Sequence, residues 1–149
     1  MDSPQFFECS LTELSSRQLY QLFRLRTQVF VVEQQCAYPE VDEIDEKAGH
    51  VLGYHQQQLV ACARLVPPGL SYPQPSIGRV AVALPFRGRG WGRQAFQYAF
   101  RQMQARYPQQ PVKIQAQQYL ESFYHRLGFR TVSRPYPDVG IMHVDMIWE

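Results

Sequence analysis

The sequence contains no apolar run long enough to cross a membrane, because no window approaches about 18 uninterrupted apolar residues. The first ten residues also lack the apolar core of an export signal and carry two acidic side chains, Asp2 and Glu8. These absences exclude a transmembrane span and a secretion signal. We therefore expect a cytoplasmic protein that works away from membranes.

Disulfide and metal frameworks are missing as well. The three cysteines, Cys9, Cys36 and Cys62, are odd in number and far apart, and none belongs to a CxxC pair. The histidines are not spaced as zinc ligands. We expect three free thiols and no bound metal.

Excess charge of one sign is also absent, since the formal net charge of the 149 residues is only +2. Basic residues cluster at a single turn, which excludes nucleic-acid binding by charge alone. A chain of this length buries roughly two-thirds of its unfolded surface without help from disulfides or metals. No repeat or low-complexity linker divides it, so residues 1–149 are predicted to form one domain.

Strands and helices are predicted to alternate along the chain, which indicates a mixed α/β class. Period-two patterns predict strands over 6–10, 50–55, 58–65, 77–82, 112–116, 129–132 and 141–148. Helical spacing predicts a first helix capped by Ser15 or Ser16 and further helices that begin at Gly92 and at Tyr119. Gly128 is expected to end the last of these in a left-handed conformation. An acidic loop over 36–48 is the longest excursion between the predicted elements.

The turn from Arg87 to Gly92 is the most informative segment. It follows a predicted strand and opens a helix, and its three glycines remove side chains where the backbone must approach another group closely. A helix that begins there directs unpaired N–H groups and the positive end of its dipole into the turn. Arg87, Arg89 and Arg93 add three full charges, so the segment predicts an anion site suited to phosphates. The alternative is a basic surface turn that only starts a helix.

Two nucleotide-binding motifs do not fit this turn. A Walker A loop ends in GK[ST], whereas Gly92 is followed by Arg93 and Gln94. A dinucleotide-binding loop has GxGxxG and an acidic residue about 20 positions later, and this chain has neither.

The remaining pattern, Arg87 followed by Gly90 and Gly92 between a strand and a helix, resembles the acetyl-CoA pyrophosphate loop of the GNAT N-acetyltransferase superfamily. The resemblance implies acetyl-CoA as cosubstrate. It assigns pyrophosphate binding to Arg87, Gly88, Arg89, Gly90, Trp91, Gly92 and Arg93. It also implies that the strand Val80-Ala81-Val82 pairs with the pantetheine amides.

A second segment, from Gln117 to Phe129, resembles the later motif of the same family, NxxAxxFYxxxGF. Gln117 stands where asparagine is common and Leu120 where alanine is common, although the Gln117 amide can still reach a cofactor. The resemblance implies that Tyr124 lies beside the cofactor sulfur and donates a proton to the leaving thiolate. Local packing explains the other apolar residues of the segment, and core packing is the alternative role for Tyr124.

The front of the chain, from Leu25 to Gln34 and on through Tyr38 and His50, is similar to the ElaA-like subgroup of this superfamily. The likeness continues to Met146 and so covers nearly the whole chain. It implies the GNAT fold: a mixed, mostly antiparallel sheet of six to seven strands, splayed between strands four and five and flanked by about four helices.

The reaction implied is direct attack of a primary amine, of a small molecule or peptide, on the acetyl carbonyl. A general base must take the amine proton, and the candidates are Glu33 first, then His50, with His143, Asp42 and Asp45 also open. Glu33 is preferred because it follows an apolar helical run. The acidic loop suits a cationic acceptor such as a polyamine, a lysine-like amine or a basic peptide, unless it is simply solvated.

Two further possibilities stay open from sequence alone. A non-catalytic acyl-CoA sensor or interaction domain would have the same fold and keep the cofactor site. Aromatic residues in the last strands offer a surface for a homodimer.

Overall fold

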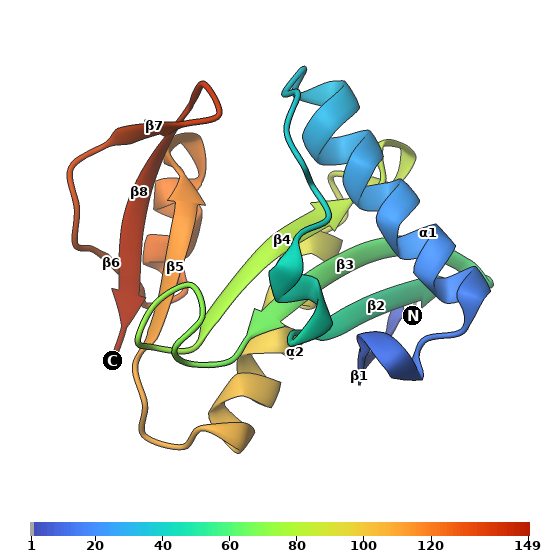
Figure 1. The fold of residues 1–149 in the computed structure, drawn as a ribbon, viewed down its shortest axis with the longest axis horizontal. Helices are drawn as coiled ribbons and strands as arrows, with labels where there is room; N and C mark the ends of the chain where they lie inside the picture. Colours follow the sequence, from blue (N-terminus) through green and yellow to red (C-terminus); the bar gives the residue numbers. More distant parts are fainter. Residues whose placement is uncertain (1) are drawn as a thin grey trace.

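The computed structural model describes residues 2–149 and builds two four-stranded sheets with three α-helices over that range (Figure 1). The first sheet is antiparallel with the order β1-β2-β3-β4. In the second sheet β8 lies at the centre, and β5, β6 and β7 pair with it antiparallel. The strands are β1 Gln5–Ser10, β2 Gly49–His55, β3 Gln58–Val66, β4 Ser76–Val82, β5 Val112–Gln117, β6 Arg130–Thr131, β7 Tyr136–Asp138 and β8 Ile141–Trp148.

The two sheets meet where β4 and β5 begin and separate beyond that point. Lys113 donates its backbone N–H to the carbonyl of Pro75 at 3.0 Å, but no ladder joins the two strands over the described residues. Figure 1 shows β4 and β5 diverging from this junction. The predicted splay is therefore confirmed, with eight strands in place of six to seven and three α-helices in place of about four.

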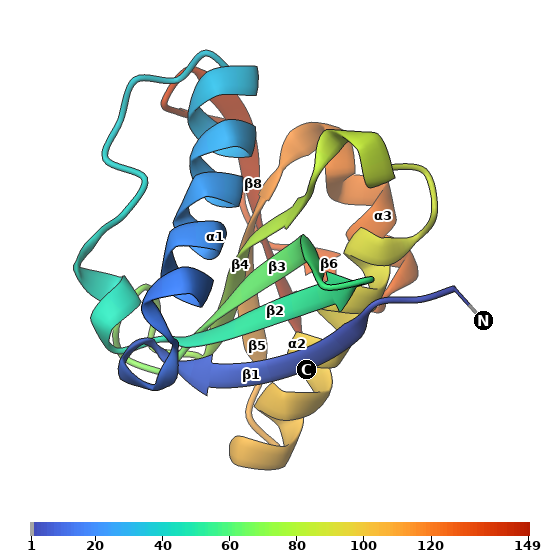
Figure 2. The same cartoon turned by 90° about the vertical axis from the view of Figure 1, so that its right-hand side faces the viewer.

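The helices cover opposite faces of the first sheet (Figure 2). The helix α1, Ser16–Thr27, is capped reciprocally by Ser15 and Gln18 and continues as a π-helical segment, Gln28–Glu33. On the other face lies α2, Trp91–Arg106, and a short α3, Glu121–Arg126, follows β5. No helix within residues 2–149 is long and apolar enough to span a membrane.

Two apolar layers hold these elements together. Phe96 and Met103 of α2 pack with Ile114 and Met146 of the second sheet, and all four are at most 2% exposed. Burial of such side chains stabilises the fold by roughly 1.5–3 kcal/mol each. On the other face α1 packs against Leu52 and Cys62 through its own apolar residues, Leu22 and Leu25.

The aromatic residues of the last strands mostly pack within the chain. Phe129 is 3% exposed, and Trp148 contacts Phe100 edge to face with ring centroids 4.9 Å apart. Phe129 is therefore not available to a dimer surface, whereas Trp148 is only partly buried, and the homodimer stays a prediction. The three cysteines are free, as predicted.

A β-bulge interrupts β4 beside the splay. Cys62 pairs with Ala81 and Arg64 with Gly78, so two residues of β4, Arg79 and Val80, lie opposite a single residue of β3. Arg79 adopts a left-handed backbone conformation with φ +51°. Bulges of this kind redirect side chains and often lie next to functional sites.

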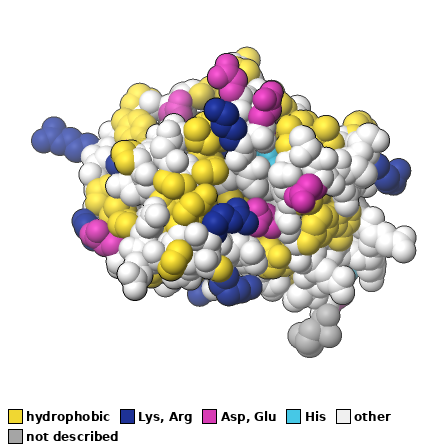
Figure 3. Space-filling view, turned by 60° about the horizontal axis from the view of Figure 1, so that its bottom comes forward, with side chains coloured by type: hydrophobic (Ala, Val, Ile, Leu, Met, Phe, Trp, Pro, Cys, Tyr) yellow, Lys and Arg dark blue, Asp and Glu magenta, His cyan; other side chains and the backbone are white. Residues whose placement is uncertain are grey.

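Acidic and basic side chains are interspersed on the face shown in Figure 3, which displays no continuous basic surface. This distribution agrees with the small net charge of +2.

Candidate active site

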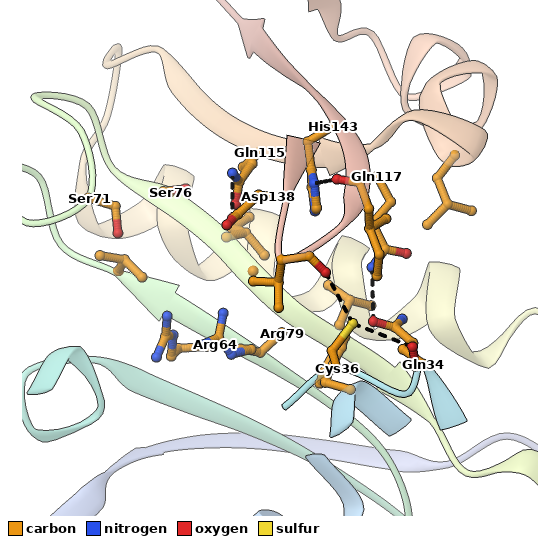
Figure 4. Close-up of a pocket in the computed structure, with 18 of the residues that line it drawn as sticks. Gln34, Cys36, Arg64, Ser71, Ser76, Arg79, Gln115, Gln117, Asp138 and His143 are labelled. Atoms are coloured by element: carbon orange, nitrogen blue, oxygen red, sulfur yellow. Dashed lines mark hydrogen bonds between the residues drawn. The ribbon is translucent and has the colours of Figure 1, made fainter. Parts of the chain in front are cut away.

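A cavity of about 390 Å³ lies between β4 and the second sheet, where the two sheets have separated (Figure 4). Its walls come from segments far apart in the sequence: the end of the π-helical segment, β3, β4, β5, α3, β7 and β8. Among the predicted site residues, Val80, Gln117, Tyr124 and the base candidate His143 line it.

Beyond Val80, the backbone of β4 forms an open sheet edge. Within residues 2–149 only β3 pairs with β4, so alternate N–H and C=O groups on the other side of β4 have no strand partner there. Ala81 itself is 4% exposed, and its side chain packs in the layer under α1. The hydrogen bond from Ala83 N–H to the Val60 carbonyl sets the alternation of the ladder, so the backbone groups of Ala81 point to β3 and those of Val82 point to the open edge. Because the Val82 carbonyl accepts from Arg87, Val82 can act on a ligand through its backbone N–H.

The glycine turn has the geometry of an anion site. Gly88 and Gly90 adopt φ +83° and +80°, and a Cβ at either position would meet no atom within 4 Å, so the backbone there is open. The helix α2 starts at Trp91 without a side-chain cap on Gly90, which leaves its first N–H groups available. A Cβ on Gly92 would instead lie 3.3 Å from Val82 Cγ2, so this glycine permits close packing of α2 on β4.

The three arginines of the turn differ in their contacts. Arg87 donates from Nε to the Val82 carbonyl at 2.9 Å and from Nη2 to Glu33 Oε1 at 2.7 Å. The Arg89 guanidinium lies over the Trp91 ring at 5.2 Å, and neither Arg89 nor Arg93, both exposed, forms an ion pair with the described residues. Two guanidinium groups therefore face solvent beside the start of α2.

Trp91 was expected among the pyrophosphate-binding residues. Its indole is 3% exposed, packs with Val60, Ala61 and Ala95, and stacks on Phe86. Only its backbone N–H, in the first turn of α2, is placed for an anion.

Tyr124 lies in α3 with its side chain between the core and the cavity. It is 8% exposed and contacts Phe96 edge to face at 5.2 Å between ring centroids. Burial, and to a smaller extent Tyr119, raises the pKa of its phenol to about 12. The phenol is therefore protonated at neutral pH. Nearby, Gln117 donates from Nε2 to Gln34 Oε1 at 3.3 Å.

His50 does not lie in the cavity, which corrects the prediction that it acts as a base. Its ring is fully buried, and Nε2 donates to the backbone carbonyl of Asp45 at 2.9 Å. Burial lowers the pKa of the imidazole, whose Nδ1 is enclosed without a partner. The structure gives His50 no path to a substrate.

The acidic loop is held by ion pairs, which corrects the expectation that its carboxylates are open to a cationic acceptor. Arg26 of α1 binds Glu40 and Asp45, both at 2.7 Å, while Arg64 binds Asp42 at 2.8 Å. Burial alone would raise the pKa of Asp45, but hydrogen bonds and charge from Arg26, with help from Arg64, hold it at about 2. Asp42 and Asp45 therefore serve the structure.

The other two loop carboxylates, Glu43 and Glu46, are exposed and do not line the cavity. Glu33 does not line it either, and its carboxylate is occupied by Arg87.

His143 is the base candidate that the structure places in the cavity. It lies on β8 directly opposite Gln117 in the strand register, and Figure 4 shows its ring directed from β8 into the cavity. Its Nδ1 lies 2.7 Å from the Ile141 carbonyl, which can only accept, so Nδ1 carries the hydrogen of the neutral ring. Its Nε2 is then an acceptor, and this atom is neither hydrogen-bonded to the described residues nor enclosed.

Sequence reasoning missed several lining residues, chiefly Arg64, Arg79, Tyr72 and Gln115. Arg64 sits in an apolar strand run, and a charged residue at such a position is the one local signal that could have identified it. Among residues 2–149, no group of three or more His, Cys, Asp or Glu side chains is arranged to hold a metal.

The family model of the acetyltransferase (GNAT) domain matches residues 12–149. ElaA from Escherichia coli K12 is 38% identical over 141 residues, covering 93% of this chain and 92% of ElaA. The UPF0039 protein sll0451 of Synechocystis is 40% identical over 137 residues, which cover 91% of this chain and 89% of sll0451. Among solved structures, an acyl-CoA N-acyltransferase from Pseudomonas aeruginosa has a TM-score of 0.93 at 35% identity, and the match covers 99% of this chain and 100% of that one. The crystal structure of E. coli ElaA has a TM-score of 0.91 at 35% identity, with 98% and 99% covered. The chain therefore belongs to the acetyltransferase (GNAT) family and, within it, to the ElaA-like subgroup.

Proposed function

We propose that this protein is an acetyl-CoA-dependent N-acetyltransferase that transfers the acetyl group directly to a primary amine. One observation carries the proposal: Tyr124, a phenol with a pKa raised to about 12, lines a cavity at the splay of β4 and β5. The glycine turn follows the open end of β4, so a phosphate site and a proton donor lie at the same end of the sheets.

Acetyl-CoA fits the described residues in three parts. Its pyrophosphate would lie on the first N–H groups of α2, between the exposed guanidinium groups of Arg89 and Arg93. Its pantetheine amides would pair with the open backbone edge of β4, from Val80 to Val82. Its thioester would then reach the cavity beside Tyr124 and Gln117.

The chemistry requires two proton transfers, and the cavity offers one group for each. His143 Nε2 takes a proton from the amine, whose nitrogen attacks the acetyl carbonyl carbon. The carbon–sulfur bond breaks, and Tyr124 donates its hydroxyl proton to the departing CoA thiolate. A backbone N–H on the open edge of β4 would stabilise the oxyanion between these steps. His143 replaces Glu33 and His50 as the proposed base because it alone of the three lines the cavity.

The first test is the thermal denaturation of the purified protein with and without acetyl-CoA or CoA. We expect both to raise the melting temperature, because each binds the folded state alone. A thiol-release assay over amines, polyamines, amino acids and peptide N-termini then measures transfer. Absence of any thermal shift would refute the proposal, and a shift without transfer to any amine would favour an acyl-CoA sensor.

A further inference from the structure

The wall of the cavity that faces His143 contains two arginines with unused hydrogen-bond donors. Arg64 comes from β3 and Arg79 from the bulge of β4, and Figure 4 shows them across the cavity from Gln115, Asp138 and His143. Neither arginine belongs to the acetyl-CoA site described above.

Arg64 is nearly buried, with its side chain 6% exposed, yet it bonds through one nitrogen only. Its Nη1 donates to Asp42 at 2.8 Å and to Asp45 at 3.1 Å. Its Nε is enclosed without a partner, while Nη2 is neither bonded to the described residues nor enclosed. The enclosed Nε is out of reach of a ligand, whereas Nη2 can donate to an acceptor group in the cavity.

Arg79 is held in place by the same acidic loop. Its Nε donates to Glu40 Oε2 at 2.7 Å and its Nη2 to the Glu40 carbonyl at 3.2 Å, while Nη1 bonds to none of the described residues. The left-handed φ of +51° is strained for a residue with a side chain, and such strain is typical of ligand sites.

The free donors of these arginines, rather than a net charge, favour a group that accepts hydrogen bonds. Arg26, Arg64 and Arg79 balance Glu40, Asp42 and Asp45, so the cluster gives a cation no net attraction. Glu40, Asp42 and Asp45 do not line the cavity; Asp138 does, on the opposite wall, where it accepts from Gln115 at 3.0 Å. A planar carboxylate matches the free arms of two guanidinium groups.

We propose that Arg64 and Arg79 bind a carboxylate of the acceptor, so that the acceptor is an amine that also carries a carboxylate, such as an amino acid. Its amine would then lie toward His143 and Asp138 on the facing wall. This proposal rests on the acetyltransferase function proposed above and specifies the acceptor class.

The test compares acceptors that differ only in the carboxylate. Glycine, β-alanine, 4-aminobutyrate and 6-aminohexanoate are each assayed beside the amide and the amine without the carboxylate. We expect kcat/KM to favour the carboxylate by at least about tenfold at one or more chain lengths, the range of a charge-assisted hydrogen bond. Equal or better rates with the amines would overturn the carboxylate subsite while leaving the acetyltransferase function intact.

The matched variants are Arg64→Lys and Arg26→Lys, with thermal denaturation to confirm that each folds. R64K keeps a cation beside Asp42 and Asp45 but removes the free Nη2 donor, so it should raise KM for carboxylate acceptors by a much larger factor than for simple amines. R26K changes the same ion-pair cluster without touching the cavity and should keep the carboxylate preference. If R64K does not fold, Arg79→Lys replaces it. Equal losses for every acceptor, or the same loss in R26K, would overturn the proposal.

A binding measurement separates this proposal from the catalytic one. The N-acetyl derivatives of the four amino acids, and their amides, are titrated into the protein by calorimetry with and without CoA. At least one acid should bind about tenfold more tightly than its amide, and R64K should abolish the difference. That result would stand even if no acetyl transfer were detected, whereas equal binding of acids and amides would overturn the subsite.

Discussion

Arg87, in the glycine turn, donates from Nη2 to Glu33 Oε1 at 2.7 Å and so ties the turn to the end of the π-helical segment. The pair is partly exposed, with side-chain exposures of 39% and 23%. The contact joins the two residues that sequence reasoning assigned to different tasks, pyrophosphate binding and base catalysis. A carboxylate already paired with a guanidinium is less available to take a proton from an amine.

Glu33→Gln should therefore leave the turnover rate and its pH dependence within about threefold of the parent protein, since a general base contributes far more than that. Glutamine can still accept from Arg87, so the turn keeps its support. Loss of the negative charge should tighten CoA binding by no more than a few-fold, because a partly exposed pair is worth at most about 1 kcal/mol. Calorimetric titration with CoA and a pH–rate profile test this prediction. Arg87→Ala is measured beside it, because it removes the positive partner of the same ion pair. If turnover by E33Q fell by two orders of magnitude or more, Glu33 would be restored as the base.

Tyr124→Phe should lower kcat by about 10²–10⁴-fold, the usual contribution of a general acid. The affinity for acetyl-CoA should change little, since the phenol hydroxyl donates late in the reaction. The ring contacts with Phe96 and Phe129 survive the change, so the melting temperature should stay close to that of the parent. Steady-state kinetics with a CoA titration separate the two effects. Equal loss of turnover and of CoA affinity would make Tyr124 a binding residue instead.

His143→Asn should remove the proposed base while keeping its backbone contact, because the asparagine amide can replace Nδ1–H as the donor to Ile141. We expect kcat/KM at neutral pH to fall by about 10²-fold or more. The difference in kcat/KM between H143N and the parent protein should become smaller as the pH rises, because the amine then loses its proton to solvent. His50→Gln is the matched control: it keeps a donor to the Asp45 carbonyl, lies outside the cavity, and should preserve the pH profile even if it lowers stability. A pH-independent loss in H143N would contradict the base assignment.

Much of the fold follows from local patterns in the sequence. Ser15 was one of two predicted caps of α1, and the structure confirms it. The hairpin between β2 and β3 turns at Gln56 and Gln57, both with positive φ, where the strand pattern breaks. Gly128 ends the α3 segment at φ +98°, as a left-handed C-terminal residue should. These features depend on neighbours a few residues apart, which is why a single sequence reveals them.

The part of the cavity proposed to bind the acceptor, with its arginines and the acidic loop behind them, could not be predicted in the same way. The acidic loop resembles a solvated or ligand-binding segment because its arginine partners lie on α1, β3 and β4, between 14 and 39 residues away from the carboxylates they bind. No local pattern links Arg26 to Asp45. The bulge at Arg79 is equally invisible, because it arises from the pairing register with β3 rather than from the composition of β4.

The ion pair between Arg26 and Asp45 should make stability sensitive to acid. Asp45 has a pKa of about 2 in the folded protein against an ordinary 3.8, so its stabilisation is complete above about pH 4 and is lost as the pH falls toward 2. The lowered pKa of Asp45 stabilises the folded protein by about 2 kcal/mol at neutral pH. Because both side chains are 1% exposed, solvent screens this pair little.

Asp45→Asn should thus lower the free energy of unfolding by about 3–5 kcal/mol at neutral pH, because it leaves the buried Arg26 charge with Glu40 alone. The variant should also show a flatter loss of stability between pH 4 and 2 than the parent protein. Urea denaturation at pH 6.5, 4 and 3 measures both effects. Glu43→Gln, in the same turn but exposed, is the control and should stay within about 0.5 kcal/mol of the parent at each pH. If D45N and the parent lost stability in parallel as the pH fell, Asp45 could not be the group whose protonation weakens the acidic loop.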